Sequence, residues 1–303
     1  MDPAQLYRDA AEAAYRRLPR SARPAARRLH HRVVPTLGAL RRRLHATAAQ
    51  VRRPAAPSVV SDPRRARRAQ CDSPRVTVVM PVRDAAPYVE AAVRSVLEQD
   101  LEELELVVVD DGSLDRTTDL VADIAARDGR LRLLRHGEPL GPSAARNDGI
   151  AAATAPFLCF LDGDDLMYPS SLRSRWEAAV VAPPGAAGSY CGWESIGPDE
   201  VPRSPQRGTP SLPRVSYLQA DGECPFIISA PLVRTDVVRA VGGFDEALHA
   251  AEDFDLWLRL LREGWWFDPV GVIGVAYRQH GSGIMRTDVI GFVDGVTAVY
   301  DSL

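Results

Sequence analysis

Three carboxylates stand together at residues 162–165, where the chain reads Asp-Gly-Asp-Asp directly after the apolar run Phe157–Leu161. Asp162 and Asp164 are two residues apart, a spacing that directs both side chains the same way in an extended chain. Carboxylates this crowded need a cation. Mg²⁺ or Mn²⁺, bound by a few carboxylates and by phosphate oxygens, fits better than Ca²⁺, because the later ligand positions of a calcium loop are missing. The pattern predicts a Mg²⁺ or Mn²⁺ site at Asp162 and Asp164; the alternative interpretation is a plain Asp-rich turn.

A second acidic group, with Glu252 and Asp253, opens a predicted helix at residues 253–262. Acids in the first turn of a helix complement its dipole, which is the simpler interpretation. A carboxylate held near a metal-bound diphosphate is also what a general base for an acceptor hydroxyl requires. The residues alone leave both interpretations open.

Arg278 and His280 follow an apolar run near the end of the chain. A lone histidine is more often structural than a ligand. Both side chains nevertheless have the chemistry to close on a diphosphate, and we keep both as candidate site residues.

The elements that must position these residues are short apolar runs separated by helical segments. The runs lack polar alternation, as buried parallel strands require. They are Val76–Met80, Leu106–Val109, Leu131–Leu134 and Phe157–Leu161. Their repetition with helices beginning near residues 87, 115 and 143 predicts an α/β fold with a doubly wound, mostly parallel sheet, whose ligands bind beyond the carboxyl ends of the strands.

Two further polar motifs fall at those strand ends. Asp111 lies in the turn Asp-Asp-Gly-Ser after the second predicted strand, where an exposed acid can hydrogen-bond a ribose or base. Arg146 lies in a loop that enters the next helix and is placed to meet a diphosphate or a base. The simpler interpretations are a strand-to-helix turn and a solvated helix arginine.

Charge is distributed unevenly along the 303 residues. Residues 1–70 hold 17 Arg against four acids, whereas the remainder holds 20 Arg against 36 acids, and the chain has no Lys. An acidic body argues against a nucleic-acid partner and fits a site that collects divalent cations.

The cysteines, Cys71, Cys159, Cys191 and Cys224, lack zinc-site spacing, and we expect them to be reduced. No apolar stretch approaches a membrane span, and the N-terminus carries acids and arginines where a signal peptide needs an apolar segment. The expected location is the cytoplasm.

The ordered set of motifs resembles the inverting family-two glycosyltransferases of the GT-A fold. The resemblance covers roughly residues 75–282 and rests on PVRDAAPYVEAAVRSVLEQ, VVVDDGSLDRT, GPSAARNDGI, FLDGDDLMYP, VGGFDEAL, AEDFDLWLRL and YRQHGSG. It implies a Rossmann-like nucleotide-binding half and a smaller acceptor-binding half. It also implies transfer of a sugar from a nucleotide diphosphate donor to an acceptor hydroxyl, with a glycan, a lipid-linked molecule or a small molecule as acceptor.

The resemblance also assigns site residues. It implies nucleotide-sugar binding by Pro81, Asp111, Arg146 and Asp162, a metal at Asp164 and Asp162, and a catalytic base at Asp253, with Glu252, Arg278 and His280 nearby. In such enzymes the base deprotonates the acceptor, the hydroxyl attacks in line, and the metal stabilises the leaving diphosphate.

Two other functions share parts of this pattern. A nucleotidyltransferase has a similar sheet and an acidic metal site, but the chain lacks a Gly-rich loop followed by Lys. A non-catalytic nucleotide-sugar-binding relative is disfavoured because Asp162, Asp164 and Asp253 are all present.

The chain divides by composition into three parts. We expect an Arg-rich arm and linker at residues 1–70, which is helical or disordered, a glycosyltransferase domain at 71–290 with halves at 71–182 and 183–290, and a C-terminal segment at 291–303. Residues 183–225 are rich in Pro, Gly and Ser and are expected to be irregular.

The arm has basic amphipathic character. Its apolar residues Leu37, Leu40, Leu44, Ala48 and Val51 share one helical face amid arginines. Peripheral contact with anionic lipid at the inner face of the cell membrane is one interpretation. A disordered tail that reflects coding bias, a start codon placed too early, and a helix docked on the acidic body are equally good ones.

Overall fold

The computed structural model describes residues 71, 73–207, 226–248, 250–280, 295 and 299. The predicted basic arm and nearly all of the predicted C-terminal segment lie outside the described residues. The boundaries of the three predicted parts therefore stay predictions.

The first half of the described chain alternates strands and helices. Its elements are β1 (Val76–Val82), α3 (Val89–Leu97), β2 (Leu104–Asp110), α4 (Thr117–Ala125), β3 (Leu131–Arg135), α5 (Pro142–Ala152) and β4 (Phe157–Phe160). The strands lie in the order β3-β2-β1-β4 and all run parallel. Each matches an apolar run in the sequence, and β2 is buried along its whole length, as strands covered on both faces must be.

The second half extends the same sheet with mixed directions. Its elements are β5 (Leu166–Met167), α6 (Ser171–Val181), β6 (Ala186–Ile196), β7 (Pro202–Arg207), β8 (Pro231–Arg234), α8 (Thr235–Ala240), α9 (Glu252–Arg262) and β9 (Trp266–Arg278). The nine-stranded sheet continues from β4 through β8, β6 and β9 to β5, with β7 beside β6. β8 is antiparallel to β4 and β6, whereas the long β6 and β9 are parallel.

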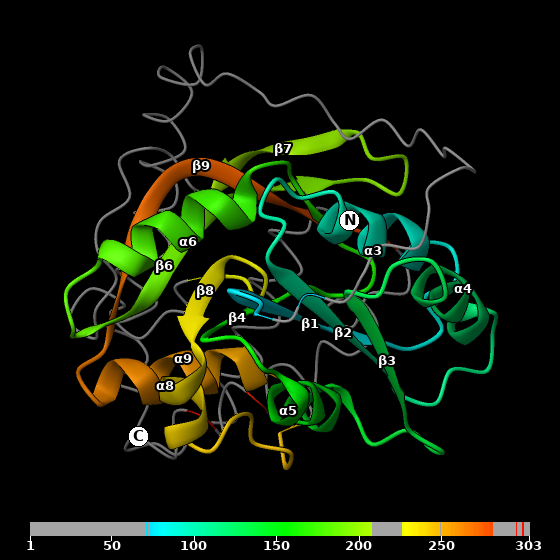
Figure 1. Cartoon of the computed structure of the whole chain (residues 1–303), viewed down its shortest axis with the longest axis horizontal. Coiled ribbons are helices and arrows are strands. Elements are labelled where there is room, and N and C mark those ends of the chain that lie inside the picture. Colours follow the sequence, from blue (N-terminus) through cyan, green and yellow to red (C-terminus); the bar gives the residue numbers. More distant parts are fainter. Residues whose placement is uncertain are drawn as a thin grey trace, which may run out of the picture. The chain divides into compact units, whose positions relative to one another are not determined.

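Helices cover both faces of this sheet. In Figure 1, α3 and α6 lie on one side of the strands, and α5, α8 and α9 lie on the other. Gly149 lets α5 approach β1 closely, since a Cβ there would meet Val79 Cγ1 at 2.2 Å. The predicted α/β fold is confirmed.

β6 differs from the sequence prediction, because residues 183–225 were expected to be irregular. Residues 186–196 instead form an 11-residue strand. Gly188 explains the difference: a Cβ there would lie 1.9 Å from the carbonyl oxygen of Leu232 on β8. The glycine that suggests a loop in the sequence permits close strand pairing in the fold.

The core of the second half is aromatic. Trp257 on α9 is fully buried and contacts Phe226 and Phe267 edge-on, with ring centroids 5.9 Å away in both cases. Phe160 at the end of β4 lies 6.5 Å from Trp257, centroid to centroid. These contacts fix α9 against the end of β4, and thus the acids of its first turn against the acids after β4.

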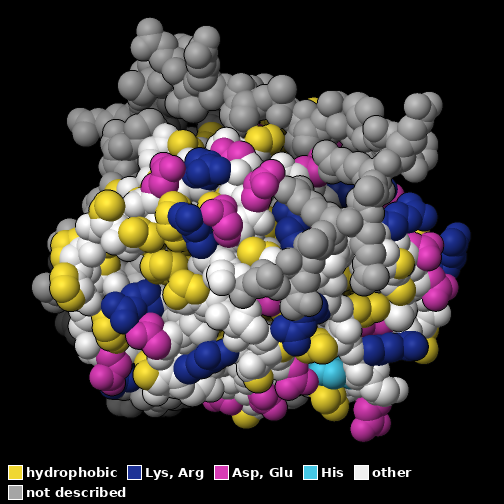
Figure 2. All heavy atoms as spheres, in the orientation of Figure 1, with side chains coloured by type: hydrophobic (Ala, Val, Ile, Leu, Met, Phe, Trp, Pro, Cys, Tyr) yellow, Lys and Arg dark blue, Asp and Glu magenta, His cyan; other side chains and the backbone are white. Residues whose placement is uncertain are grey.

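The surface carries charges of both signs. Figure 2 shows acidic and basic side chains interspersed over the described part of one face, without a continuous basic stripe.

Candidate active site

The acidic motif after β4 meets the segment that follows β9. The Oδ2 atom of Asp164 lies 2.7 Å from Nε2 of His280, so the structure brings together two motifs that are 116 residues apart. Burial and the charge of Asp162 raise the pKa of Asp164, and the His280 contact partly offsets this. Negative charge is therefore concentrated here.

The third carboxylate of the motif has a different role. Asp165 is fully buried and accepts hydrogen bonds from the backbone N–H of Arg278 (2.8 Å) and from the Ser229 hydroxyl (3.3 Å). Burial, together with the charges of Asp164 and Asp162, raises its pKa well above the usual range. Asp165 thus ties β9 to the motif, whereas Asp162 and Asp164 keep accessible side chains, about one third exposed.

Arg146 lies at the centre of the site. Its guanidinium donates to Asp162 Oδ1 at 2.8 Å and to Glu252 Oε1 at 2.6 Å, and it also lies 5.4 Å from the ring centroid of Phe244. The side chain is only 5% exposed. Such bonds between charged groups are the strong ones, so Arg146 connects the first turn of α9 to the motif after β4.

Asp253 lies next to this bridge. Ala251, the residue before α9 and two residues before Asp253, has φ 62°, a left-handed conformation uncommon for a residue with a side chain, and such strain gathers at functional sites. Asp253 Oδ1 accepts the backbone N–H of Phe254 at 2.7 Å. Burial and the charge of Glu252 raise its pKa to about 7, while Arg146 acts in the opposite direction. A carboxyl that titrates near neutrality suits a general base.

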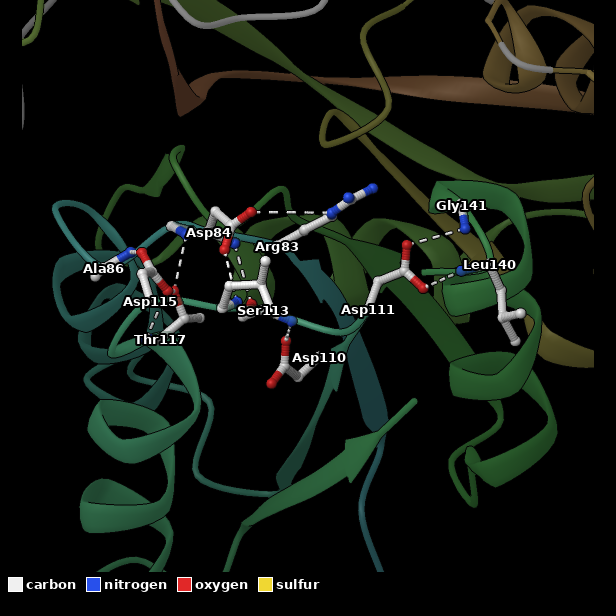
Figure 3. A network of polar contacts seen from close by, with 12 residues as sticks. Arg83, Asp84, Ala86, Asp110, Asp111, Ser113, Asp115, Thr117, Leu140 and Gly141 are labelled. Atoms are coloured by element: carbon white, nitrogen blue, oxygen red, sulfur yellow. Dashed lines mark hydrogen bonds and ion pairs between the residues drawn. The ribbon is translucent and has the colours of Figure 1, made fainter. Parts of the chain in front are cut away.

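Two strand-to-helix loops beyond β1 and β2 are joined by hydrogen bonds (Figure 3). The Ser113 hydroxyl accepts the N–H of Asp84, and Asp84 Oδ1 accepts the N–H of Leu114. Thr117 Oγ1 accepts the N–H of Ala85. These bonds preform the loop edge that follows Pro81, the last-but-one residue of β1.

Asp111 holds a third loop. Its carboxylate accepts the N–H groups of Leu140 (2.7 Å) and Gly141 (2.9 Å), where the chain enters α5, as Figure 3 shows. His136 Nδ1 lies 2.8 Å from the same carboxylate. Burial alone would raise the pKa of Asp111, but these hydrogen bonds lower it, so the group is firmly ionised.

His136 is a residue that the sequence reasoning missed. It directly follows β3, and the rule that ligands gather beyond strand ends applies to it as it does to Asp111. The signal was present, but no motif drew attention to a single histidine.

Arg278 is buried, and its guanidinium donates to the Asp164 carbonyl (2.7 Å), the Pro198 carbonyl (3.3 Å) and Glu200 (3.0 Å). These bonds favour a supporting role. The ring of His280 packs on Tyr88 with centroids 4.9 Å apart. Of Arg278 and His280, it is therefore His280 whose side chain contacts the Asp164 carboxylate.

The residues of the motif after β4 fit a divalent cation that is shared with a ligand. Among the described residues, no three His, Cys, Asp or Glu side chains converge to bind a metal by themselves. Mg²⁺ and Mn²⁺ sites commonly use only one or two carboxylates with substrate phosphates, and Asp162 with Asp164 supply that donor set. Burial, followed by the nearby charge of Asp162, raises the pKa of Asp164, and a bound cation would relieve the crowding of the two carboxylates.

Within the part of the chain that the structure describes, no helix has the length and apolar character to span a bilayer.

Comparison with solved structures identifies the fold as GT-A. The chain matches the crystal structure of Staphylococcus aureus TarS 1–349 in complex with UDP-GlcNAc with a TM-score of 0.56 at 19% identity, over 70% of this chain and 61% of the TarS 1–349 chain. It matches the mannosyltransferase PcManGT from Pyrobaculum calidifontis, in complex with GDP-Man and Mn²⁺, with a TM-score of 0.52 at 20% identity, over 89% and 68% of the two chains.

Residues 77–229 match the family model described as glycosyl transferase family 2. The chain belongs to this family. It is 33% identical over 217 residues to the pre-mycofactocin glycosyltransferase of Mycobacterium tuberculosis, a match that covers 67% of this chain and 43% of the relative. The chain likewise spans less than two thirds of other curated relatives, including Bacillus subtilis EpsJ and Rhizobium meliloti ExoU.

Proposed function

We propose that the protein is an inverting glycosyltransferase that moves a sugar from a nucleotide diphosphate donor to an acceptor hydroxyl. The observation that carries the proposal is the Arg146 bridge. It joins Asp162 of the motif after β4 to Glu252 of α9, the residue before Asp253, and this supports a role for Asp253 at the proposed donor site. Family membership and the donors named with the TarS and PcManGT structures support this function.

Asp253 is the base in this proposal. Its carboxylate takes the proton of the acceptor hydroxyl while the acceptor oxygen bonds to the anomeric carbon. The bond from that carbon to the diphosphate breaks on the opposite face, so the configuration inverts and the nucleoside diphosphate leaves. A pKa of about 7 leaves Asp253 substantially ionised near neutral pH while keeping it a useful proton acceptor.

Asp164 and Asp162 would hold Mg²⁺ or Mn²⁺, with His280 beside them. The ion supplies positive charge to the leaving diphosphate when bound. The presence of Mn²⁺ in the PcManGT complex supports this part of the proposal. In this proposal Pro81, Asp111 and Arg146 bind the nucleotide, and the hydrogen-bonded loops of Figure 3, which include Asp111, support this side of the site.

The acceptor in this proposal is a hydroxyl of a glycan, a lipid-linked molecule or a small molecule. Acceptor binding falls to the half of the chain after residue 182, and the protein acts in the cytoplasm.

A panel of UDP-, GDP- and dTDP-sugars with Mn²⁺ tests the proposal. We expect at least one donor to release nucleoside diphosphate and to raise the melting temperature, because a ligand that binds only the folded state stabilises it. Asp164→Asn should abolish both effects. Asp123→Asn, the same chemical change on the exposed face of α4, is the matched control and should change neither.

Release of pyrophosphate instead would identify a nucleotidyltransferase. Stabilisation without turnover for every acceptor class would favour a non-catalytic relative. Normal turnover by Asp164→Asn and by chelator-treated wild type would refute the metal site.

A further inference from the structure

We propose that His136 is a positioning residue of the nucleoside pocket, which as an imidazolium ties Asp111 to α5 and makes donor binding weaken as the pH rises above neutral. The proposal rests on the proposed function, because it concerns the same donor site. It adds a residue and a pH dependence that the motifs of the sequence do not suggest.

Both ring nitrogens of His136 face carboxylates. Nδ1 lies 2.8 Å from Asp111 Oδ1, and Nε2 lies 2.8 Å from Asp148 Oδ2 on α5. A neutral imidazole has one N–H donor and one lone pair, and the lone pair repels a carboxylate oxygen. Only the imidazolium donates at both positions, so the geometry is that of a charged histidine. The side chain is 9% exposed, and its contact with Asp111 is largely shielded from water, whereas the contact with Asp148 is open to solvent.

The imidazolium acts on a segment that leads into the site. Asp111 accepts the N–H groups of Leu140 and Gly141 immediately before α5 begins at Pro142. Asp148 is on the same helix and 57% exposed. His136 therefore fastens both the entry to α5 and its middle to the end of β2. Arg146, which bonds Asp162 in the motif after β4, lies on α5 between its entry and Asp148, in the part of the helix that His136 holds.

The charged groups around His136 set the direction of the pH effect. They are Asp110 and Asp111 at the end of β2, Asp148 on α5, and Arg135 and Glu138, which flank His136 in the chain. Arg135 forms an ion pair with Asp110 at 3.7 Å. Burial opposes the charge on His136, but the hydrogen bonds and charges of Asp111 and Asp148 outweigh it and raise its pKa above 6.5.

A histidine whose pKa is raised by folding stabilises the folded state fully below pH 6.5 and loses this contribution as the pH rises through the raised value. Above that pH, one of the two carboxylates faces a lone pair instead of an N–H. The anchor on Leu140 and Gly141 then loosens, and the nucleoside pocket loses its preformed edge.

The test compares wild type with His136→Gln and Asp148→Asn. Dissociation constants of UDP and GDP with Mn²⁺ are measured by calorimetry between pH 6 and 9. Changes in phosphate or metal ionisation are common to all three proteins, so the ratio of variant to wild type isolates the histidine. We expect His136→Gln to bind about tenfold more weakly at pH 6, as loss of a charged hydrogen bond implies, and the ratio to fall toward one by pH 9.

Asp148→Asn retains the histidine and changes an exposed residue, so it keeps the proposal testable if His136→Gln does not fold. We expect its donor affinity to weaken at lower pH than in wild type. NMR of the imidazole signals, with His136 assigned by sequential assignment of the wild-type spectrum, should show the same displacement without any nucleotide.

A pH-independent ratio, or a His136 signal that titrates below 6.5 in wild type, overturns the proposal. Failure of wild type to bind either nucleotide would overturn the proposed function instead, while the NMR titration still decides the state of His136.

Discussion

Replacing Asp253 with Asn separates the chemical role of this carboxyl from its effect on stability. Burial and Glu252, opposed by Arg146, raise the pKa of Asp253 from 3.8 to about 7. The unfolded chain releases this proton near pH 3.8 and the folded protein near pH 7, so Asp253 lowers the free energy of unfolding progressively as the pH rises between these values.

The magnitude follows from the gap between the two pKa values. At about 1.4 kcal/mol for each pKa unit, a gap of about 3 corresponds to about 4 kcal/mol. Asp253 is partly exposed, and water contact reduces this to roughly 2 to 4 kcal/mol. Asn has nearly the same shape and no charge, so Asp253→Asn should be more stable than wild type by this amount at pH 8 and equal to it near pH 4.

Denaturant unfolding at pH 4, 6 and 8 measures the stability, and initial rates with the active donor measure the chemistry. We expect transfer to fall by about 10² to 10⁴, as loss of a general base does, while nucleotide affinity stays within about threefold. Asp123→Asn on α4 is the control and should leave both quantities unchanged.

If Asp253→Asn is no more stable than wild type at pH 8, burial of the Asp253 charge is not costly and the stated cause of its raised pKa is wrong. Retained transfer, or an equal loss of nucleotide affinity, would refute the base assignment.

Three other outcomes follow from the structure. Glu252→Gln removes a charge that raises the pKa of Asp253, so the acidic limb of the pH–rate profile should move to lower pH; an unmoved limb would contradict the coupling. Gly188→Ala puts a Cβ 1.9 Å from the Leu232 carbonyl and should destabilise the fold by about 3 kcal/mol, visible as a lower melting temperature, whereas an unchanged melting temperature would refute the packing argument. If the arm contacts membranes, deleting residues 1–70 should abolish salt-sensitive flotation with anionic liposomes; equal flotation of both proteins would exclude this role.

The first half of the fold was predictable because its signal is local. Unbroken apolar runs mark the buried strands, and polar residues at their ends mark the ligand edge. The helix that begins at Glu252 was predictable for the same reason, since its apolar stripe and its first-turn acids lie within a few residues of one another.

The contacts within the site were not predictable in this way. Nothing local indicates that Arg146 joins Asp162 to Glu252, because that bridge depends on how α9 packs against the end of β4. The distinction between Asp165 and its two neighbours depends equally on a distant partner, the backbone of Arg278. β6 was not predicted because its small residues, such as Gly188, are typical of loops. They occur here because neighbouring strands approach closely.

The Arg146 bridge and the β4–β8 pairing both join segments that are far apart in the chain, so neither can form until late in synthesis. Glu252 is made 90 residues after Asp162, which at about 5 to 20 residues per second is a delay of roughly 5 to 20 s. Until Pro231–Arg234 emerges from the ribosome, β4 is an open strand edge able to pair with other chains. During that interval Arg146 has Asp162 but not Glu252 as a partner, and the edge of β4 is uncovered, so any protection of this edge against pairing with other chains has to act before the Arg146 bridge can form.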